Sequence, residues 1–316
     1  MTPPSKNPLA ACRLCPRGCG ADRLAGKVGW CRSGARARVF RWGPHFGEEP
    51  PISGTNGAGT IFFSNCTLGC LYCQNHPWSQ QGKGEDMSAA RLAEIMAELS
   101  AKGCHNWDLV SPTPWLPMIR EAASIYPASD KRLPFVYNSS GFESLDALDE
   151  YQDLADIALT DLRYSSPDLA AYASGSREYV DAARLALLWF CTHLGPLETD
   201  ANGIAKRGVI CRLLVLPGHP EEAVNSLRWI ADNIGPELCV SVMSQYTPVW
   251  HAVGNGDWGR KVTRDEYQKV TDEAERLGFE TGWIQPFDAE DDESLLGCEM
   301  SAGEGQAGRK QQEAKV

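Results

Sequence analysis

From residue 59 onward, short apolar runs alternate with segments whose apolar residues recur at helical spacing. Strands are predicted at 59–64, 107–110, 135–137, 157–160, 209–216, 238–243 and 283–285. Helices are predicted at 88–103, 118–123, 145–154, 169–172, 182–190, 221–234 and 263–278. Because parallel neighbours in a sheet need a crossover connection, usually a helix, serial strand–helix units predict a parallel sheet. Six or more such units predict an α/β domain built as a full or partial barrel.

Composition limits the classes to which the chain can belong. Of its 316 residues, 43% are hydrophobic and 22% are charged, as in an ordinary globular protein with a sizeable core. The net charge of −11 argues against a nucleic acid partner, because proteins that bind the phosphate backbone carry a basic face. The sequence shows neither a signal-peptide pattern nor an apolar stretch of membrane-spanning length, so we expect a cytoplasmic protein without membrane association.

Three cysteines, Cys66, Cys70 and Cys73, directly follow the first predicted strand. Three thiolates make an incomplete coordination shell. A structural zinc site closes itself with four protein ligands, whereas a centre held by three keeps one position open for a substrate. The alternatives are a zinc ion shared with a distant fourth ligand and a chance grouping of cysteines.

A second group of cysteines lies near the N-terminus, at Cys12, Cys15, Cys19 and Cys31. The chain has twelve cysteines, and thiols stay reduced in the cytoplasm, so tight C-x2-C and C-x3-C pairs indicate metal ligands rather than disulfides. Four cysteines suffice for a second metal centre, either a tetrahedral zinc ion, which would fold the segment, or a 4Fe-4S cluster, which could relay electrons. Both alternatives stay open, with a catalytic dithiol as a third.

These patterns divide the chain into four parts. We predict a flexible N-terminus at 1–11, a small Cys-rich metal-binding segment at 12–54, the barrel at 55–290 and a disordered acidic and polar tail at 291–316. Four further cysteines are predicted to be small buried hydrophobic residues: Cys104, Cys191, Cys211 and Cys239. Four histidines lie in predicted loops, the first two on the surface and the last two near the substrate opening: His45, His76, His219 and His251.

The C-x3-C-x2-C spacing at residues 66–73 is that of the radical SAM cluster loop, and the chain resembles the uncharacterised radical SAM relatives of pyruvate formate-lyase activating enzyme. The resemblance extends from about residue 12 to 285 and rests on several blocks in order. They are Cys12-Arg-Leu-Cys15-Pro-Arg, His45-Phe-Gly-Glu-Glu-Pro50, Ile52-Ser-Gly54, the cysteines with Gln74-Asn75, Tyr137-Asn-Ser-Ser-Gly141, Gly203-Ile-Ala-Lys-Arg-Gly208, Leu214-Val-Leu-Pro-Gly218 and Gln245-Tyr-Thr-Pro248. It implies a partial (β/α)6 TIM-like radical SAM barrel, with a 4Fe-4S cluster on Cys66, Cys70 and Cys73 that chelates S-adenosylmethionine.

The resemblance also implies which residues bind the cofactor. Tyr72 takes the place of an aromatic residue that faces adenine. Where activating enzymes carry a Gly-Gly-Glu stretch for the methionine amino group, this chain has Ser111-Pro-Thr113-Pro, whose hydroxyls and carbonyls could accept hydrogen bonds from an ammonium. Asn138 is placed like the polar residue that contacts the ribose.

Three charged residues complete the implied cofactor site. Asp161 and Arg163 occupy the places of an Asp-x-Lys pair after the fourth strand, and the arginine keeps the charge of the lysine but changes its geometry. Arg212 lies at the position of an arginine near the methionine carboxylate. For each polar residue, the alternative is a strand-end group that only holds a loop.

The predicted function is that of a radical SAM enzyme of activase-like or oxidoreductase type. The cluster would cleave S-adenosylmethionine reductively to a 5′-deoxyadenosyl radical, which abstracts hydrogen from a substrate that the sequence does not identify. The resemblance suggests a glycyl radical enzyme as the protein substrate, with a small metabolite or another peptide as alternatives. An electron donor such as flavodoxin or ferredoxin is implied. The alternative from another class is a non-catalytic iron–sulfur redox sensor or electron-transfer protein.

Overall fold

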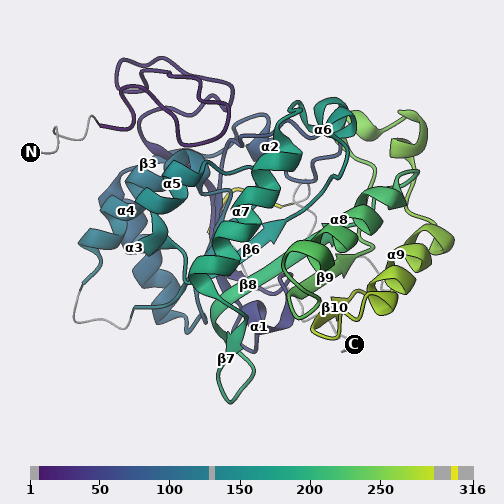
Figure 1. Ribbon diagram of the computed structural model, residues 1–316. Coiled ribbons are helices and arrows are strands. Elements are labelled where there is room, and N and C mark those ends of the chain that lie inside the picture. The colour runs from purple at the N-terminus through teal and green to yellow at the C-terminus, as the bar shows by residue number, and fades with distance from the viewer. Residues whose placement is uncertain (1–6, 128–131, 288–299, 305–316) are drawn as a thin grey trace, which may run out of the picture.

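A computed structural model describes residues 7–127, 132–287 and 300–304 and shows one large sheet with helices packed along it (Figure 1). The strands are β1 (Ala37–His45), β2 (Ala58–Phe63), β3 (Glu85–Met87), β4 (Trp107–Val110), β5 (Phe135–Ser139), β6 (Ile157–Asp161), β7 (Glu198–Thr199), β8 (Ala205–Leu214), β9 (Cys239–Met243), β10 (Gly282–Ile284) and β11 (Gly303–Glu304). The α-helices are α1 (Pro50–Ser53), α2 (His76–Ser79), α3 (Ala89–Ala101), α4 (Leu116–Ile125), α5 (Leu145–Glu150), α6 (Pro167–Ser174), α7 (Tyr179–Leu194), α8 (Pro220–Asn233) and α9 (Arg264–Arg276). No helix among the described residues is both long and apolar enough to cross a membrane.

Strands β2, β4, β5, β6, β8, β9 and β10 lie side by side in this order, and every neighbouring pair is parallel. The order in the sheet is the order in the chain, as expected when each crossover returns over the same face. The predicted α/β class with a parallel sheet is therefore confirmed. The sheet is open, because the free edge of β2 pairs with the antiparallel strand β1.

The two faces of the parallel strands have different surroundings, because side chains alternate between the faces of a strand. One face packs under the helices and belongs to the main core, as do Leu109, Tyr137 and Val209. On the other face, apolar side chains near the starts of the strands form a separate small core with Ile52 of α1. The same face becomes polar toward the strand ends, with Asn138, Asp161 and Arg212 as examples.

Two segments near the sheet differ from the sequence-based expectation. Strand β1 was not predicted, and residues 37–54 of the Cys-rich segment supply this strand and α1 to the barrel side of the molecule. Strand β8 begins at Ala205 rather than at the predicted residue 209, because its first residues pair with β7 in an antiparallel hairpin.

The predicted helices are present with shifted ends. Two of them begin with capping residues: the Ser88 side chain accepts a hydrogen bond from Arg91 N, and Thr263 forms a capping box with Glu266. The predicted helix at 145–154 is divided, because α5 ends at Glu150 and a 3-10 turn, Gln152–Leu154, follows.

The predicted flexible N-terminus and tail lie partly outside the described residues, namely at 1–6, 291–299 and 305–316. Within the described part of the tail, β11 pairs with β1 through Arg41 and Gly303.

Gly208 gives a test of this fold, because its φ is +114° and a Cβ there would stand 2.2 Å from the carbonyl oxygen of Pro196. We expect Gly208→Ala to lower the free energy of unfolding by about 2–4 kcal/mol, through backbone strain and overpacking at the β7–β8 hairpin. The control is Gly203→Ala, where φ is +77° but nothing lies within 4 Å of the added carbon. It should cost about 1 kcal/mol. Equal losses in urea unfolding would contradict the close packing at Gly208.

Candidate active site

The three cysteines lie on a loop, residues 66–73, that starts three residues after β2 ends. We call it the cysteine loop. Backbone hydrogen bonds tie it to the end of α6, from Gly69 N to Ser174 O at 3.0 Å and from Leu71 N to Ala173 O at 2.8 Å. On its other side His251 N donates to Leu71 O at 3.0 Å. The loop is thus fixed at the carboxyl ends of the parallel strands, where ligands of such sheets bind.

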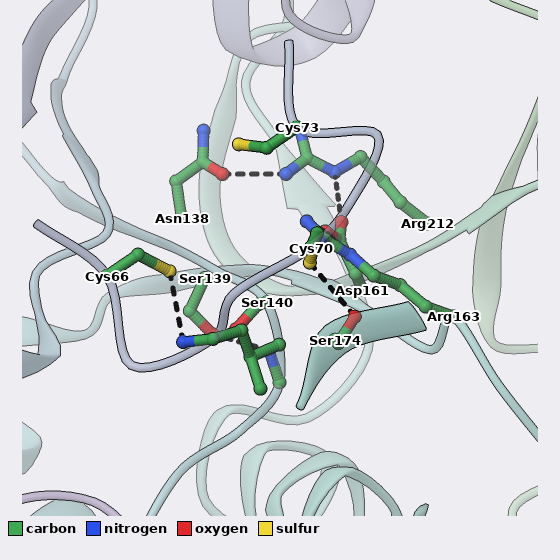
Figure 2. A network of polar contacts seen from close by, with 12 residues as sticks. Cys66, Cys70, Cys73, Asn138, Ser139, Ser140, Asp161, Arg163, Ser174 and Arg212 are labelled. Carbon is green, nitrogen blue, oxygen red and sulfur yellow. Dashed lines mark hydrogen bonds and ion pairs between the residues drawn. The ribbon is translucent and has the colours of Figure 1, made fainter. Parts of the chain in front are cut away.

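Each thiol of the cysteine loop contacts a hydrogen-bonding group, and Figure 2 shows the contacts of Cys66 and Cys70. Cys70 Sγ accepts a hydrogen bond from Arg163 Nη1 at 3.1 Å and lies 3.0 Å from Ser174 Oγ. Cys73 Sγ lies 3.1 Å from Ser79 Oγ, and Cys66 Sγ accepts from the backbone N–H of Leu68 at 3.5 Å. Donors of this kind stabilise a thiolate more than a thiol, so the set suits sulfur ligands of a metal centre.

Without a metal, the thiols of Cys66 and Cys73 are protonated at neutral pH. Burial raises the pKa of Cys66 to about 11 and that of Cys73 to about 12. Across residues 7–127, 132–287 and 300–304, no group of three or more His, Cys, Asp or Glu side chains is arranged to hold a single metal ion. Three thiols with hydrogen-bonding groups beside them suit a 4Fe-4S cluster, in which each thiolate binds a different iron atom.

Asp161, at the end of β6, joins the cysteine loop to the sheet. Its Oδ2 accepts from Arg163 Nε at 2.9 Å and from Arg163 Nη2 at 2.5 Å, while its Oδ1 accepts from Arg212 Nε at 2.8 Å. Burial alone would raise the pKa of Asp161, but the two guanidinium groups outweigh it and hold the pKa below its ordinary value. The carboxylate is therefore ionised, and it orients both arginines.

Arg212 continues the network across the polar face of the sheet. Its Nη2 donates to Asn138 Oδ1 at 2.7 Å, and its Nη1 donates to Glu48 Oε2 at 3.0 Å. Asn138 Nδ2 lies 3.2 Å from Glu48 Oε1 and 3.1 Å from Asp108 Oδ1. Burial raises the pKa of Glu48, and burial together with the nearby carboxyl group of Glu48 raises that of Asp108 well above its ordinary value.

The strand end at Ser111 and Thr113 contacts two other parts of the site. Ser111, with φ of +60°, donates from its backbone N–H to Asn138 O at 2.9 Å. Thr113 Oγ1 donates to the carboxylate of Glu143 at 2.8 and 2.9 Å, and Tyr137 OH donates to the same group at 2.9 Å. Burial of Glu143 raises its pKa to about 7. A carboxyl group thus lies beside Thr113 although the local sequence has none.

Tyr72 lies beside Tyr164, whose hydroxyl is also 2.6 Å from Ser174 Oγ, the group that contacts Cys70. The Tyr72 ring stacks on Trp258 with centroids 5.5 Å apart, and its hydroxyl lies 2.6 Å from that of Tyr164. Only 5% of Tyr72 is exposed. The structure thus gives Tyr72 a packing role between the cysteine loop and residues 250–259, and its contact with adenine stays a prediction.

The histidines lie in different environments. His45 is buried against Phe62 at the end of β1, and burial lowers its pKa to about 4. His76 stacks on Trp250, and His219 packs against Trp258. His219 and His251 thus lie on segments that border the cysteine loop, as does His76, whose Nδ1 lies 3.2 Å from Cys73 O.

The structure joins five of the predicted site residues in one hydrogen-bond network, and Cys66 and Cys73 lie on the same loop as its Cys70 (Figure 2). The five are Cys70, Asn138, Asp161, Arg163 and Arg212. The N-terminal cysteines form a separate group, which lines one cavity together with Thr67 and Thr113. Sequence reasoning did not assign Glu48, Asp108 or Glu143. Asp108 carried a signal, because it is the one charged residue in the apolar strand Trp107–Val110.

Comparisons with known proteins give the following similarities. No protein-family model matches the chain. The uncharacterized protein MJ0674 of Methanocaldococcus jannaschii is 26% identical over 285 residues, which cover 87% of this chain and 78% of that protein.

Two solved structures that contain S-adenosylmethionine are similar to this chain. Streptococcus suis SuiB bound to S-adenosylmethionine matches with a TM-score of 0.48 at 12% identity, over 76% of this chain and 56% of SuiB. The structure of anSMEcpe with bound AdoMet matches with a TM-score of 0.48 at 12% identity, over 74% of this chain and 65% of that chain. The chain thus spans less than two thirds of the length of either protein.

Methylornithine synthase (PylB) matches with a TM-score of 0.45 at 14% identity, over 84% of this chain and 71% of that chain.

We expect Asp161→Asn to lower the free energy of unfolding of the cluster-free protein by about 3 kcal/mol, because it leaves two buried guanidinium groups without their shared carboxylate. Asp153→Asn is the matched control, since the Asp153 side chain is 55% exposed and pairs with Arg120 at the surface. It should cost less than about 1 kcal/mol. Similar losses for both variants in urea unfolding would show that Asp161 does not organise the site.

Glu143 predicts a pH dependence of stability. Its pKa in the fold, about 7, is above its ordinary value of 4.5, so its stabilising effect is present below pH 4.5 and is lost as the pH rises toward 7. Between these values, the free energy of unfolding of wild type relative to Glu143→Gln should fall by up to about 1.4 kcal/mol per pH unit. Urea unfolding of both cluster-free proteins at several pH values measures this. Parallel curves would contradict the assignment.

Proposed function

We propose that the protein is a radical SAM enzyme. The observation that carries the proposal is the cysteine loop: three thiols, each with a hydrogen-bonding partner, at the carboxyl ends of parallel strands. A 4Fe-4S cluster bound there through three cysteines leaves one iron for S-adenosylmethionine and, when reduced, supplies the electron that cleaves its sulfonium bond to a 5′-deoxyadenosyl radical.

Residues of this chain would hold the cluster from several elements. Cys66, Cys70 and Cys73 supply the thiolates. Arg163, which contacts Cys70 Sγ, places a positive charge beside the sulfur, and Ser79 and Ser174 offer hydroxyl donors. Charge and hydrogen bonds to the sulfurs set the reduction potential of such a centre.

The arginine network would bind S-adenosylmethionine. Three Arg212 nitrogens each donate one hydrogen bond to Asp161, Glu48 or Asn138. A guanidinium has five N–H donors, so two remain for a carboxylate such as that of methionine. The Ser111 hydroxyl and the carbonyl groups of 111–113 offer acceptors for the methionine ammonium. Asn138 Oδ1, which accepts one hydrogen bond from Arg212, can accept a second from a ribose hydroxyl.

Within this class, we propose hydrogen abstraction from a substrate that approaches the strand ends, with flavodoxin or ferredoxin as electron donor. The resemblance to relatives of pyruvate formate-lyase activating enzyme favours a glycyl radical enzyme as that substrate. The apolar core of Ile52, Val136 and Ile210 closes the starts of the strands. Access from the cysteine-loop end is therefore the route that the fold leaves for a substrate.

Formation of 5′-deoxyadenosine tests the proposed radical SAM activity. We expect the anaerobically reconstituted protein, reduced with dithionite in the presence of S-adenosylmethionine, to produce 5′-deoxyadenosine detectable by liquid chromatography. Cys73→Ala should lose the product, because the cluster loses a ligand. Cys191→Ala, a change on α7 away from the loop, should keep it. An intact, reducible cluster that yields no 5′-deoxyadenosine would instead assign the protein to electron transfer.

A further inference from the structure

The four N-terminal cysteines differ in burial, but they line a single cavity. It is bordered by Cys12, Leu14, Cys15, Arg17, Cys19, Trp30, Cys31, Thr67, Thr113 and Pro114. Cys12 is buried, Cys15 and Cys31 are half-buried and Cys19 is exposed, so the group of thiols reaches from the core to the surface. We propose that Cys12, Cys15, Cys19 and Cys31 bind a second iron–sulfur cluster that passes electrons to the centre on the cysteine loop. The relay rests on the proposed function, whereas the second cluster does not.

The place of the site favours a cluster over a single zinc ion. Four thiolates suffice for either centre, but only an iron–sulfur cluster takes up and releases an electron. Thr67 of the cysteine loop and Thr113 line the same cavity as the four cysteines. A centre in this cavity therefore lies beside the loop that would hold the first cluster, which needs an electron for each cleavage.

The segment is built around its cysteines. Arg23 is buried, with Nε and Nη2 donating to Gly34 O and Nη1 donating to Pro114 O at 2.6 Å. The same Nη1 lies 3.8 Å from Cys12 Sγ. A buried guanidinium therefore lies near one thiol, as Arg163 lies near Cys70. Positive charge at this place compensates the charge that thiolates and a cluster bring into a buried site.

The cavity lies directly against the cysteine loop. Thr67 is part of its wall, and Cys66 is the preceding residue, one Cα–Cα step of about 3.8 Å away. Arg17 fixes the contact, because its Nε donates to Thr67 O at 2.8 Å and its Nη2 donates to Gly175 O at 3.0 Å. Figure 1 shows the purple N-terminal segment at the same end of the molecule as α2 and α6, which flank the cysteine loop.

The outer side of the segment suits an acidic electron carrier. Residues 12–36 contain five arginines and one lysine against one aspartate, in a chain whose net charge is −11. Four of these basic side chains are exposed, namely Arg13, Lys27, Arg32 and Arg36. Trp30 is 51% exposed and Cys19 is exposed as well, so an aromatic ring and a ligand of the cluster face the same solvent side. Opposite charge steers the encounter of such partners.

The electron path follows from this arrangement. A reduced carrier protein gives one electron to the second cluster and is itself oxidised by one electron. The second cluster passes that electron to the centre on the cysteine loop, where it is used to cleave the sulfonium bond of S-adenosylmethionine. Methionine and a 5′-deoxyadenosyl radical leave, so each cleavage consumes one electron from the carrier.

The experiment compares the full-length protein with two multiple variants after anaerobic reconstitution with iron and sulfide. One variant combines Cys66→Ala, Cys70→Ala and Cys73→Ala, and the other combines Cys12→Ser, Cys15→Ser, Cys19→Ser and Cys31→Ser. Cys191→Ser is the matched control, because this half-buried cysteine lines neither site. Iron and zinc are measured by elemental analysis, folding by circular dichroism, and cluster type by electron paramagnetic resonance after dithionite reduction.

We expect about eight irons per wild-type and control chain and about four in each multiple variant. The signal of the Cys66/Cys70/Cys73 variant should not respond to S-adenosylmethionine, whereas that of the N-terminal variant should. Flavodoxin with its reductase should reduce the cysteine-loop cluster in wild type but lose this ability in the N-terminal variant, which dithionite still reduces.

One equivalent of zinc in wild type, or a folded Cys66/Cys70/Cys73 variant without iron, would overturn the proposed second cluster. Undiminished reduction by flavodoxin in the N-terminal variant would overturn the relay. If the N-terminal variant does not fold, the iron content of the Cys66/Cys70/Cys73 variant decides the proposal by itself. Failure of the proposed function is distinct, because it appears as a cysteine-loop signal that does not respond to S-adenosylmethionine.

Discussion

The carboxylate of Asp161 is the group on which the arrangement of the site depends. It lies at the end of β6 and binds Arg163 on one oxygen and Arg212 on the other. Arg163 then reaches Cys70 on the cysteine loop, and Arg212 reaches Glu48, which precedes α1 at the opposite end of the sheet. Side chains far apart in sequence are thus positioned by one buried ionised group, whose loss would leave two charges without compensation.

The alternation of side chains in the parallel sheet explains why the polar network lies on one face of the sheet and why it is stable. Side chains alternate, so every second residue of β5, β6 and β8 faces away from the helices. Near the strand starts these residues are apolar, as Val136, Ile157 and Ile210 are, and they form a small core. Two residues further along the same face they are Asn138, Leu159 and Arg212, and Asp161 follows. The apolar layer supports the polar layer and keeps water out from below, which strengthens electrostatic interactions in the network.

Local sequence patterns predicted most helices and strands, but they did not predict which segments contact each other over long distances in the chain. Strand Trp107–Val110 and the caps at Ser88 and Thr263 follow from local sequence, and the structure has them in place. Strand β1 was missed because it follows a Cys- and Gly-rich segment without a core of its own. The cysteine spacing predicted the three thiols. The contact of Glu48 with Arg212 could not be predicted, because it joins residues 164 positions apart in the chain and depends on how the segment before α1 packs against the sheet.

The end of β4 connects the two groups of cysteines. Ser111 bonds to the backbone of Asn138 and so belongs to the arginine network, while Thr113, two residues later, lines the N-terminal cavity. Thr113 also donates to Glu143. The hydroxyl groups of Thr113 and Tyr137 offset the cost of burying this carboxyl group. The chain turns at Ser111, where φ is +60°. Because of this turn, one polar residue of the strand end faces the arginine network and another lines the N-terminal cavity. Any displacement of this turn must alter the arginine network and the cavity wall together, because residues 111–113 belong to both.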